Sequence, residues 1–130
     1  LLRKQRPQLL KYTRYIKQMP KIILASKSKV RKKILDDYDI LNESKPSNVD
    51  EDIVKSSLLK EKASPELISK NLAELKANKI SEKFSDNLVL GADSVIDLDG
   101  ELISKPEDRE EALEILKKLN GKKHYLISSV

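Results

Sequence analysis

The sequence contains no cysteine, a single histidine and only three glycines, and each scarcity excludes a class of site. Without cysteine there is neither a disulfide framework nor a thiolate metal site, and one histidine excludes a His-rich zinc centre. The few glycines form neither a Walker loop nor a G-x-G-x-x-G fingerprint. No apolar run approaches the length of a membrane span, and the N-terminus lacks the apolar segment of a signal peptide. We therefore expect a soluble, cytoplasmic protein that does not enter membranes.

Positive charge is concentrated at the N-terminus. Six cations and no acid lie in residues 1–20, whereas the other residues are nearly neutral within a total net charge of +5. Met19 is the only methionine and immediately precedes the first expected strand, so we interpret it as the natural start. Residues 1–18 are then a basic extension outside the fold, and residues 19–130 form one domain. The alternative is a basic arm that binds RNA, although nucleic acid is not the expected partner.

The stretch Lys21–Leu35 predicts a buried strand, a serine-rich loop and a basic helix. Residues 22–25 are apolar and partly β-branched, while apolar residues from Val30 onward recur at helical spacing. The loop between them holds Ser26 and Ser28 beside lysines. Since a helix N-terminus offers free backbone N–H groups and a positive dipole end, this loop suits a phosphate. The alternative is a serine-capped helix without a ligand.

Strands alternate with helices along the rest of the chain, which predicts an α/β fold with a mixed central sheet and flanking helices. The expected elements are an extended segment near 40–45, a helix opening at the acidic residues 50–52, a helix beginning at Ser64-Pro65, a strand over 87–96 interrupted at 91–93, a hairpin at Asp99-Gly100, a helix over 107–119 and a strand over 125–129.

Apolar residues recur at helical spacing in each expected helix. They are Val30, Ile34 and Leu35; Ile53, Leu58 and Leu59; Leu67, Leu72, Leu75 and Ile80; and, as the expected buried face of the last helix, Ala112, Leu113, Leu116 and Leu119.

Asp93 is the strongest catalytic candidate from the residues alone. It is a carboxylate within an otherwise apolar run, where an unpaired charge costs several kcal/mol, so it requires a cation, hydrogen-bond donors or a water-filled cleft. The small residues Gly91 and Ala92 before it allow another group to approach the backbone closely. The hairpin that follows should return Lys105 to the end of the first strand. The alternative role for Asp93 is structural, as a partner of loop amides.

Three other polar features each have two interpretations. The acidic residues at 50–52 either complement a helix dipole or bind a metal. By itself, Lys76 is typical of a solvated lysine on a helix surface. His124, at the start of the last strand, is either a base or, more commonly for such a residue, a structural hydrogen-bonding group.

Taken together, six short motifs in order resemble the Maf family of nucleoside triphosphate pyrophosphatases. They are L-A-S-K-S-K-V-R-K-K-I-L, V-D-E, L-A-E-L-K-A, G-A-D-S-V, I-S-K-P and G-K-K-H, spread over residues 21–130. The resemblance implies an elongated fold like that of inosine-triphosphate pyrophosphatase, with a cleft and commonly a homodimer. It also implies hydrolysis of a nucleoside triphosphate to the monophosphate and pyrophosphate with a divalent cation, Mg²⁺ or Mn²⁺.

The resemblance assigns roles by position. It makes Asp93 the proton acceptor and implies that Glu51 and Asp93 are metal ligands. Substrate-binding roles fall to Ser26, Ser28, Arg31, Lys76 and Lys105. Specificity is implied at Val30 and Ser94, where family members that prefer thymidine or uridine triphosphate have arginine and threonine, and those acting on 7-methylguanosine triphosphate have tryptophan and glutamine.

The sequence departs from the family pattern in two respects. The usual S-P-R-R-x-E is Ser28–Lys33 here, S-K-V-R-K-K, which loses the first arginine at position 30. Family members also continue for roughly another third of their length, with a glutamine-glycine motif in the nucleotide pocket. The expected function is therefore nucleoside triphosphate hydrolysis with relaxed base selectivity, serving nucleotide-pool sanitation and division arrest. The rival hypothesis is a truncated, non-catalytic protein that binds nucleotide or a partner.

Overall fold

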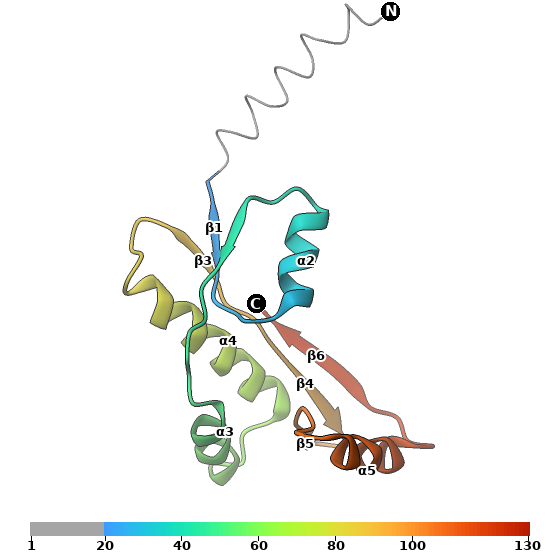
Figure 1. Ribbon diagram of the computed structural model, residues 1–130. Helices are drawn as coiled ribbons and strands as arrows, with labels where there is room; N and C mark the ends of the chain where they lie inside the picture. The colour runs from blue at the N-terminus through green and yellow to red at the C-terminus, as the bar shows by residue number, and fades with distance from the viewer. Residues whose placement is uncertain (1–19) are drawn as a thin grey trace, which may run out of the picture.

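The computed structural model describes residues 20–130, which form six strands and four helices (Figure 1). In chain order these are β1 (Ile22–Leu24), α2 (Lys29–Asp37), β2 (Asn42–Ser44), α3 (Glu51–Lys60), α4 (Pro65–Ser81), β3 (Leu88–Leu90), β4 (Asp93–Leu98), β5 (Glu101–Ile103), α5 (Arg109–Leu119) and β6 (Tyr125–Ser129). The predicted extension 1–18 and the proposed start at Met19 lie outside the described residues. No helix over residues 20–130 is long and apolar enough to cross a membrane.

The strands form two three-stranded sheets. β1 is central in a parallel sheet of order β2-β1-β3, and β4 is central in an antiparallel sheet of order β5-β4-β6. The α/β class and the presence of both strand directions are confirmed. The single mixed sheet is corrected within residues 20–130, because the chain leaves the parallel sheet after Leu90 and pairs with new neighbours from Asp93 onward.

Gly91 makes this change of sheet sterically feasible. A Cβ atom at this position would lie 2.1 Å from the carbonyl oxygen of Ala73 and 2.8 Å from the backbone nitrogen of Ala77, both on α4. Only glycine lets the bend between β3 and β4 approach the helix so closely. The expected close approach at this point is confirmed, and Asp93, the first residue of β4, accepts hydrogen bonds from Ser69 and Lys76 of α4. β4 and α4 lie side by side (Figure 1).

Local capping chemistry fixes where the helices begin. At each N-terminus a Ser or Asp side chain accepts a hydrogen bond from the backbone N–H three residues later. The caps are Ser28, Asp50, Ser64 and Asp108. The predicted start of α4 is confirmed, whereas α5 begins two residues later than expected, because Asp108 serves as its cap.

The best-buried apolar residues lie on β1 and on α4, which packs mainly against β4 and β6. Leu24 is 1% exposed, and Ile68 and Leu72 are fully buried. Of the predicted apolar positions on α4, Leu72 and Ile80 are buried and Leu67 and Leu75 are exposed. The buried face also carries Ser69 and Lys76, which contact Asp93 at the start of β4.

The predicted buried face of α5 is wrong for the described part of the chain, and several apolar residues of α2 and α3 are exposed as well. Helices α3 and α5 contain no buried residue: Ile53 is 66% and Leu116 is 64% exposed. On α2 only Leu35 is buried, while Val30 and Ile34 are exposed. Among residues 20–130, few contacts with other elements cover these helix faces. The helical period of the apolar residues therefore identifies an apolar stripe, but no other element packs on it.

Candidate functional site

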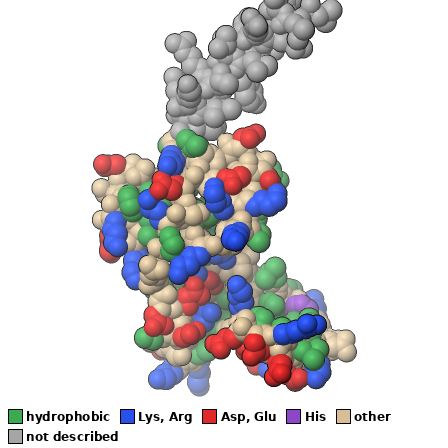
Figure 2. Space-filling view, in the orientation of Figure 1, with side chains coloured by type: hydrophobic (Ala, Val, Ile, Leu, Met, Phe, Trp, Pro, Cys, Tyr) green, Lys and Arg blue, Asp and Glu red, His purple; other side chains and the backbone are tan. Residues whose placement is uncertain are grey.

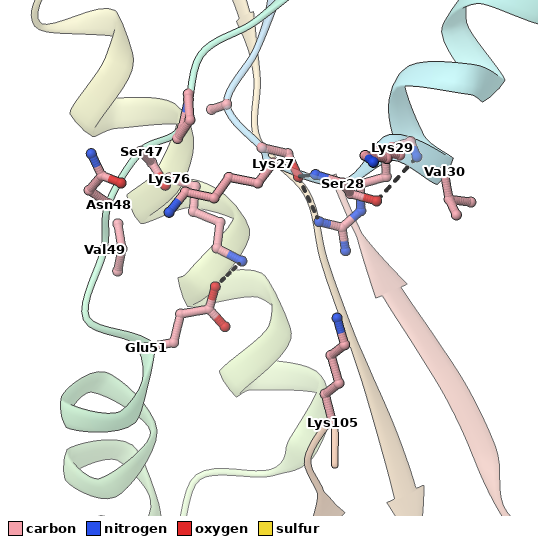
Figure 3. Close-up of a pocket in the computed structure, with 14 residues that line it drawn as sticks. Lys27, Ser28, Lys29, Val30, Ser47, Asn48, Val49, Glu51, Lys76 and Lys105 are labelled. Carbon is pink, nitrogen blue, oxygen red and sulfur yellow. Dashed lines mark hydrogen bonds and ion pairs between the residues drawn. The ribbon is translucent and has the colours of Figure 1, made fainter. Parts of the chain in front are cut away.

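A cavity of about 560 Å³ opens where β1 runs into the loop before α2 (Figure 3). It is bounded by this loop, by residues 46–49 after β2, and by side chains from α3, α4 and the segment after β5. Seven residues that the sequence pointed to line it: Ser26, Ser28, Val30, Arg31, Glu51, Lys76 and Lys105. The expected return of Lys105 to the end of the first strand is confirmed. On one face of the molecule, Lys and Arg side chains gather across the middle (Figure 2).

The serine loop is held by its own hydroxyl groups. Ser26 Oγ accepts a hydrogen bond from the backbone N–H of Ser28 at 3.1 Å, and Ser28 Oγ accepts one from the backbone N–H of Arg31 at 3.2 Å. Both oxygens act as acceptors here, so each hydroxyl proton remains available to an anion. The loop therefore presents donors beside the positive end of α2, as expected for a phosphate site.

Arg31 connects the loop to the β3–β4 bend. Its Nη1 donates to the carbonyl oxygen of Ala92 at 2.9 Å and to Ser26 Oγ at 3.4 Å, and its Nη2 donates to Ser94 Oγ at 3.4 Å. Much of its donor capacity is thus used within the protein. In this structure Arg31 positions the loop against β4, and its predicted contact with substrate stays a prediction.

Lys76 bridges two carboxylates, Glu51 on the lining of this cavity and Asp93 on the lining of an adjoining one, and we call these three residues the deep side of the cavity. Its Nζ lies 2.8 Å from Glu51 Oε1 and 2.9 Å from Asp93 Oδ1. Lys76 is 7% and Asp93 5% exposed, so the lysine is not the solvated residue that its helical position suggested. The requirement of buried Asp93 for a cation is met by Lys76. The contact between Lys76 and Asp93 depends on the close approach of the β3–β4 bend to α4 at Gly91.

Glu51 and Asp93 experience this cation differently. Burial opposes ionisation of Glu51, but the hydrogen bond and charge of Lys76, together with the charge of Lys55, lower its pKa below the ordinary value. Asp93 uses Oδ1 for Lys76, and its Oδ2 is buried with no hydrogen-bond partner. A buried carboxylate oxygen without a partner is costly, and it is the one acceptor at this site that a ligand or water would satisfy.

A second cavity of about 530 Å³ adjoins the first and shares Ser28, Val30 and Arg31 with it. Asp93 and Ser94 line this second cavity, whose other residues are mostly apolar. The hydroxyl oxygen of Ser94 is 2.9 Å from that of Ser128 on β6. The two predicted specificity positions, Val30 and Ser94, therefore meet in one cavity, next to the one that holds the cations.

Sequence reasoning did not select Lys27, Asn48 or Ser128. Lys27 and Asn48 line the first cavity and Ser128 the second. The signal for Lys27 was its place between the two serines, whereas Ser128 becomes apparent only from its pairing with Ser94 across β4 and β6. His124 is exposed and lines neither cavity.

Comparison with known families matches residues 21–130 to the family described as Maf-like protein. The chain belongs to the Maf family. A nucleoside triphosphate pyrophosphatase of Pelagibacter ubique is 73% identical over 109 residues, which cover 84% of this chain and 56% of the relative. The Maf chain thus spans about half the length of the curated relatives it matches.

More distant Maf relatives differ in the substrate in their names. A dTTP/UTP pyrophosphatase of Ruminiclostridium cellulolyticum is 36% identical, with 86% of this chain and 55% of the relative covered. A 7-methyl-GTP pyrophosphatase of Rhizobium etli is 34% identical, with 85% and 56% covered. These relatives place the present chain in the family, and its own base preference has to be argued from its residues.

The Maf residues fit a divalent cation of the magnesium type. Within residues 20–130 there is no group of three or more His, Cys, Asp or Glu side chains, which excludes an all-protein cage in that part of the chain. Mg²⁺ usually binds one or two carboxylates plus substrate phosphates and water. Glu51 and Asp93 each contact Lys76 Nζ through one oxygen, and Asp93 Oδ2 lacks a partner. This donor set suits a cation that arrives with a phosphate.

Proposed function

We propose that this chain binds a nucleoside triphosphate and hydrolyses it to the monophosphate and pyrophosphate. The observation that carries the proposal is the Lys76 bridge, which joins Glu51, on the lining of a cavity with five cationic side chains, to Asp93, on the lining of the adjoining cavity. The names of the relatives support the same reaction. Maintenance of nucleotide pools in the cytoplasm, with a link to division arrest, belongs to this proposal.

The triphosphate chain fits the first cavity. Its negative charges require fixed donors that do not have to reorganise, and the loop around Ser26 and Ser28 offers hydroxyl protons and backbone N–H groups at the start of α2. Lys105 approaches from the segment after β5 (Figure 3). Binding is thus assigned to groups on loops, and their charge is what selects a polyphosphate.

Hydrolysis is assigned to Asp93. In the proposed step the oxygen of a water molecule forms a bond to the α-phosphorus, the bond from that phosphorus to the α,β-bridging oxygen breaks, and pyrophosphate leaves. The water proton passes to Asp93 Oδ2, the carboxylate oxygen that has no partner in the protein. Lys76 keeps Asp93 in place through Oδ1. A divalent cation held by Glu51 and Asp93 would offset phosphate charge and polarise the phosphoryl oxygens.

The second cavity is assigned to the base. It is mostly apolar, as a planar base requires, and it offers hydroxyl groups at Ser94 and Ser128. Val30 has no donor for a base carbonyl, so the wrong base leaves no buried polar group unpaired there. We therefore infer relaxed selectivity, with a slight bias towards thymidine and uridine triphosphates because Ser94 retains a hydroxyl.

Binding without turnover is the second candidate function, and one observation favours it. Lys76 occupies one oxygen of both carboxylates, so in this conformation the pair is already neutralised in part without a metal. A protein with this arrangement could hold a nucleotide and present it to a partner. This candidate predicts tight nucleotide binding with no release of pyrophosphate.

The test is pyrophosphate release from a panel of canonical and 7-methylated nucleoside triphosphates with Mg²⁺ or Mn²⁺. We expect release by the wild-type chain and none above background by Asp93→Asn. Binding of the same nucleotides without release would favour the second candidate. If inorganic phosphate is released in place of pyrophosphate, the proposed reaction is wrong.

A further inference from the structure

The cations around the first cavity fall into two groups by their contacts. Arg31 is bonded to Ala92, Ser26 and Ser94, and Lys76 is bonded to Glu51 and Asp93. In residues 20–130, by contrast, no hydrogen bond or ion pair involves the ammonium group of Lys27, Lys29 or Lys105. All three side chains are exposed. A multiply charged ligand would therefore meet Lys27, Lys29 and Lys105 without breaking any protein contact.

Lys27 extends across the cavity. In Figure 3 its side chain runs from the serine loop towards Asn48, while Lys105 enters from below, beside β4. The two ammonium groups thus approach the cavity from different segments. Acidic charge on its lining is limited to Glu51, which Lys76 and Lys55 already neutralise.

The direction of Lys27 follows from the loop. Ser26 is 8% exposed and bonds the backbone of Ser28, while Ser28 caps α2. The backbone N–H of Ser26 also donates to the carbonyl oxygen of Leu24 at 2.8 Å. With both flanking residues tied to the strand and the helix, the backbone at Lys27 is ordered before a ligand arrives. Ordering the backbone in advance lowers the entropic cost of a contact made by its side chain.

The first turn of α2 supplies no free cation at position 30, because Val30 is 69% exposed and offers neither charge nor a donor. We propose that Lys27 is a phosphate-binding residue that supplies from the loop a cation that position 30 on the helix does not provide. The ligand group it takes is the terminal, pyrophosphate portion of a polyphosphate. The inference rests on the proposed function of the cavity, but its test does not require turnover.

The probe is inorganic pyrophosphate, titrated calorimetrically into the whole chain in the presence of EDTA, so that neither base nor metal contributes. We expect Lys27→Ala to weaken binding by about tenfold, as loss of a charge-assisted hydrogen bond should, and Lys27→Arg to bind within about threefold of wild type. The matched control is Lys33→Ala, which removes the same charge from α2 at a residue that pairs with Asp37 and does not line the cavity.

A compensating variant tests whether a cation introduced at position 30 can take the place of Lys27. Adding Val30→Arg to Lys27→Ala should restore most of the lost pyrophosphate affinity, and raised ionic strength should reduce the difference between wild type and Lys27→Ala. Equal binding by wild type and Lys27→Ala would overturn the proposal, as would equal losses in Lys27→Ala and Lys33→Ala. If Val30→Arg does not restore pyrophosphate affinity, the claim that Lys27 takes the place of a cation at position 30 is wrong.

The two proposals fail in different ways. If the chain binds pyrophosphate through Lys27 but releases none from nucleotides, hydrolysis is wrong and the Lys27 site stands. If hydrolysis proceeds with the same KM in Lys27→Ala as in wild type, the Lys27 assignment is wrong and the reaction stands. If the wild-type chain does not bind pyrophosphate at all, the Lys27 assignment is wrong, and hydrolysis is decided by the release of pyrophosphate from nucleotides.

Discussion

The deep side of the first cavity and its rim use charge in opposite ways. On the deep side, Lys76 and Asp93 are buried and bonded to each other, and Glu51 completes the group. At the rim, Lys27 and Lys105 are exposed and make no ion pair with other residues in 20–130. Buried charges must be paired because desolvation is expensive, whereas exposed charges need no partner. The deep charges thus have fixed geometry, which suits chemistry, and the rim charges are free for binding.

The two regions also differ in how they are built. The deep side depends on α4, on the bend at Gly91 and on the first residue of β4, all within the best-packed part of the described chain. The rim consists of loops. We therefore expect substitutions on the deep side to affect stability as well as turnover, and substitutions at the rim to affect binding with little change in stability.

The largest effect on stability is expected from Lys76→Met. The substitution keeps most of the side-chain volume but leaves Asp93 as a buried carboxylate without a cation, which costs about 3–5 kcal/mol of the free energy of unfolding. Urea denaturation at neutral pH measures it. Adding Asp93→Asn should recover part of the loss, because the uncompensated charge is then gone. If the losses in the free energy of unfolding caused by Lys76→Met and by Asp93→Asn simply add in the double variant, Lys76 and Asp93 are not coupled as proposed.

Gly91→Ala should have the next largest effect. The new methyl group would meet the carbonyl oxygen of Ala73, which belongs to a helix backbone and cannot move away easily. We expect a loss of about 1–3 kcal/mol in the free energy of unfolding and a lower turnover number, because the distance from Asp93 to Lys76 must change. Thermal denaturation and steady-state kinetics measure these. Unchanged values would show that the bend does not set the geometry of the deep side.

A smaller effect, on selectivity, is expected from Val30→Arg. Val30 lies on the boundary between the two cavities and is 69% exposed, so the larger side chain fits without loss of stability. A donor at this position should raise kcat/KM for thymidine and uridine triphosphates over guanosine triphosphate and its 7-methyl form by roughly tenfold. The ratio between nucleotides cancels any gain from phosphate contacts. Strong selectivity in wild type, or an unchanged ratio, would reject the assignment of the second cavity.

The smallest expected effect, on stability, concerns a surface cluster in which one acid lies between two lysines. The deep side has the opposite arrangement, with one lysine between two acids. Glu43 is an exposed acid between two lysines, with hydrogen bonds from Lys21 and Lys45 at 2.6 Å each. These bonds and charges lower the pKa of Glu43 from 4.5 to about 2. Its contribution to stability is complete above the unfolded pKa near 4.5 and is lost as the pH falls through about 2.

The difference in urea midpoint between wild type and Glu43→Gln should therefore be small, constant at neutral pH and absent near pH 2. High salt should reduce it at every pH, since these side chains are exposed. A large or salt-independent difference would mean that exposed ion pairs here behave like the buried one, which would remove the contrast between the two regions.

Local chemistry made some features predictable from sequence. Ser28 and Ser64 mark helix starts through their own hydrogen bonds, and Asp93 within an apolar run had to find a cation. The identity of that cation was not available from the residues alone, because the burial of Lys76 depends on how α4 packs beside the bend at Gly91. The exposure of Leu116 was likewise unpredictable, since a helical period shows an apolar stripe without showing what covers it.

The most direct test of the account is hydrolysis of thymidine triphosphate in ¹⁸O-labelled water, followed by mass spectrometry of both products, with wild type and Asp93→Asn. Attack on the α-phosphorus places the label in the monophosphate and leaves the pyrophosphate unlabelled. We predict that pattern in wild type, and in Asp93→Asn a turnover lower by a factor of roughly a thousand or more with the fold retained. Label in the pyrophosphate, or turnover in Asp93→Asn close to that of wild type, would contradict the assignment of chemistry to the deep side.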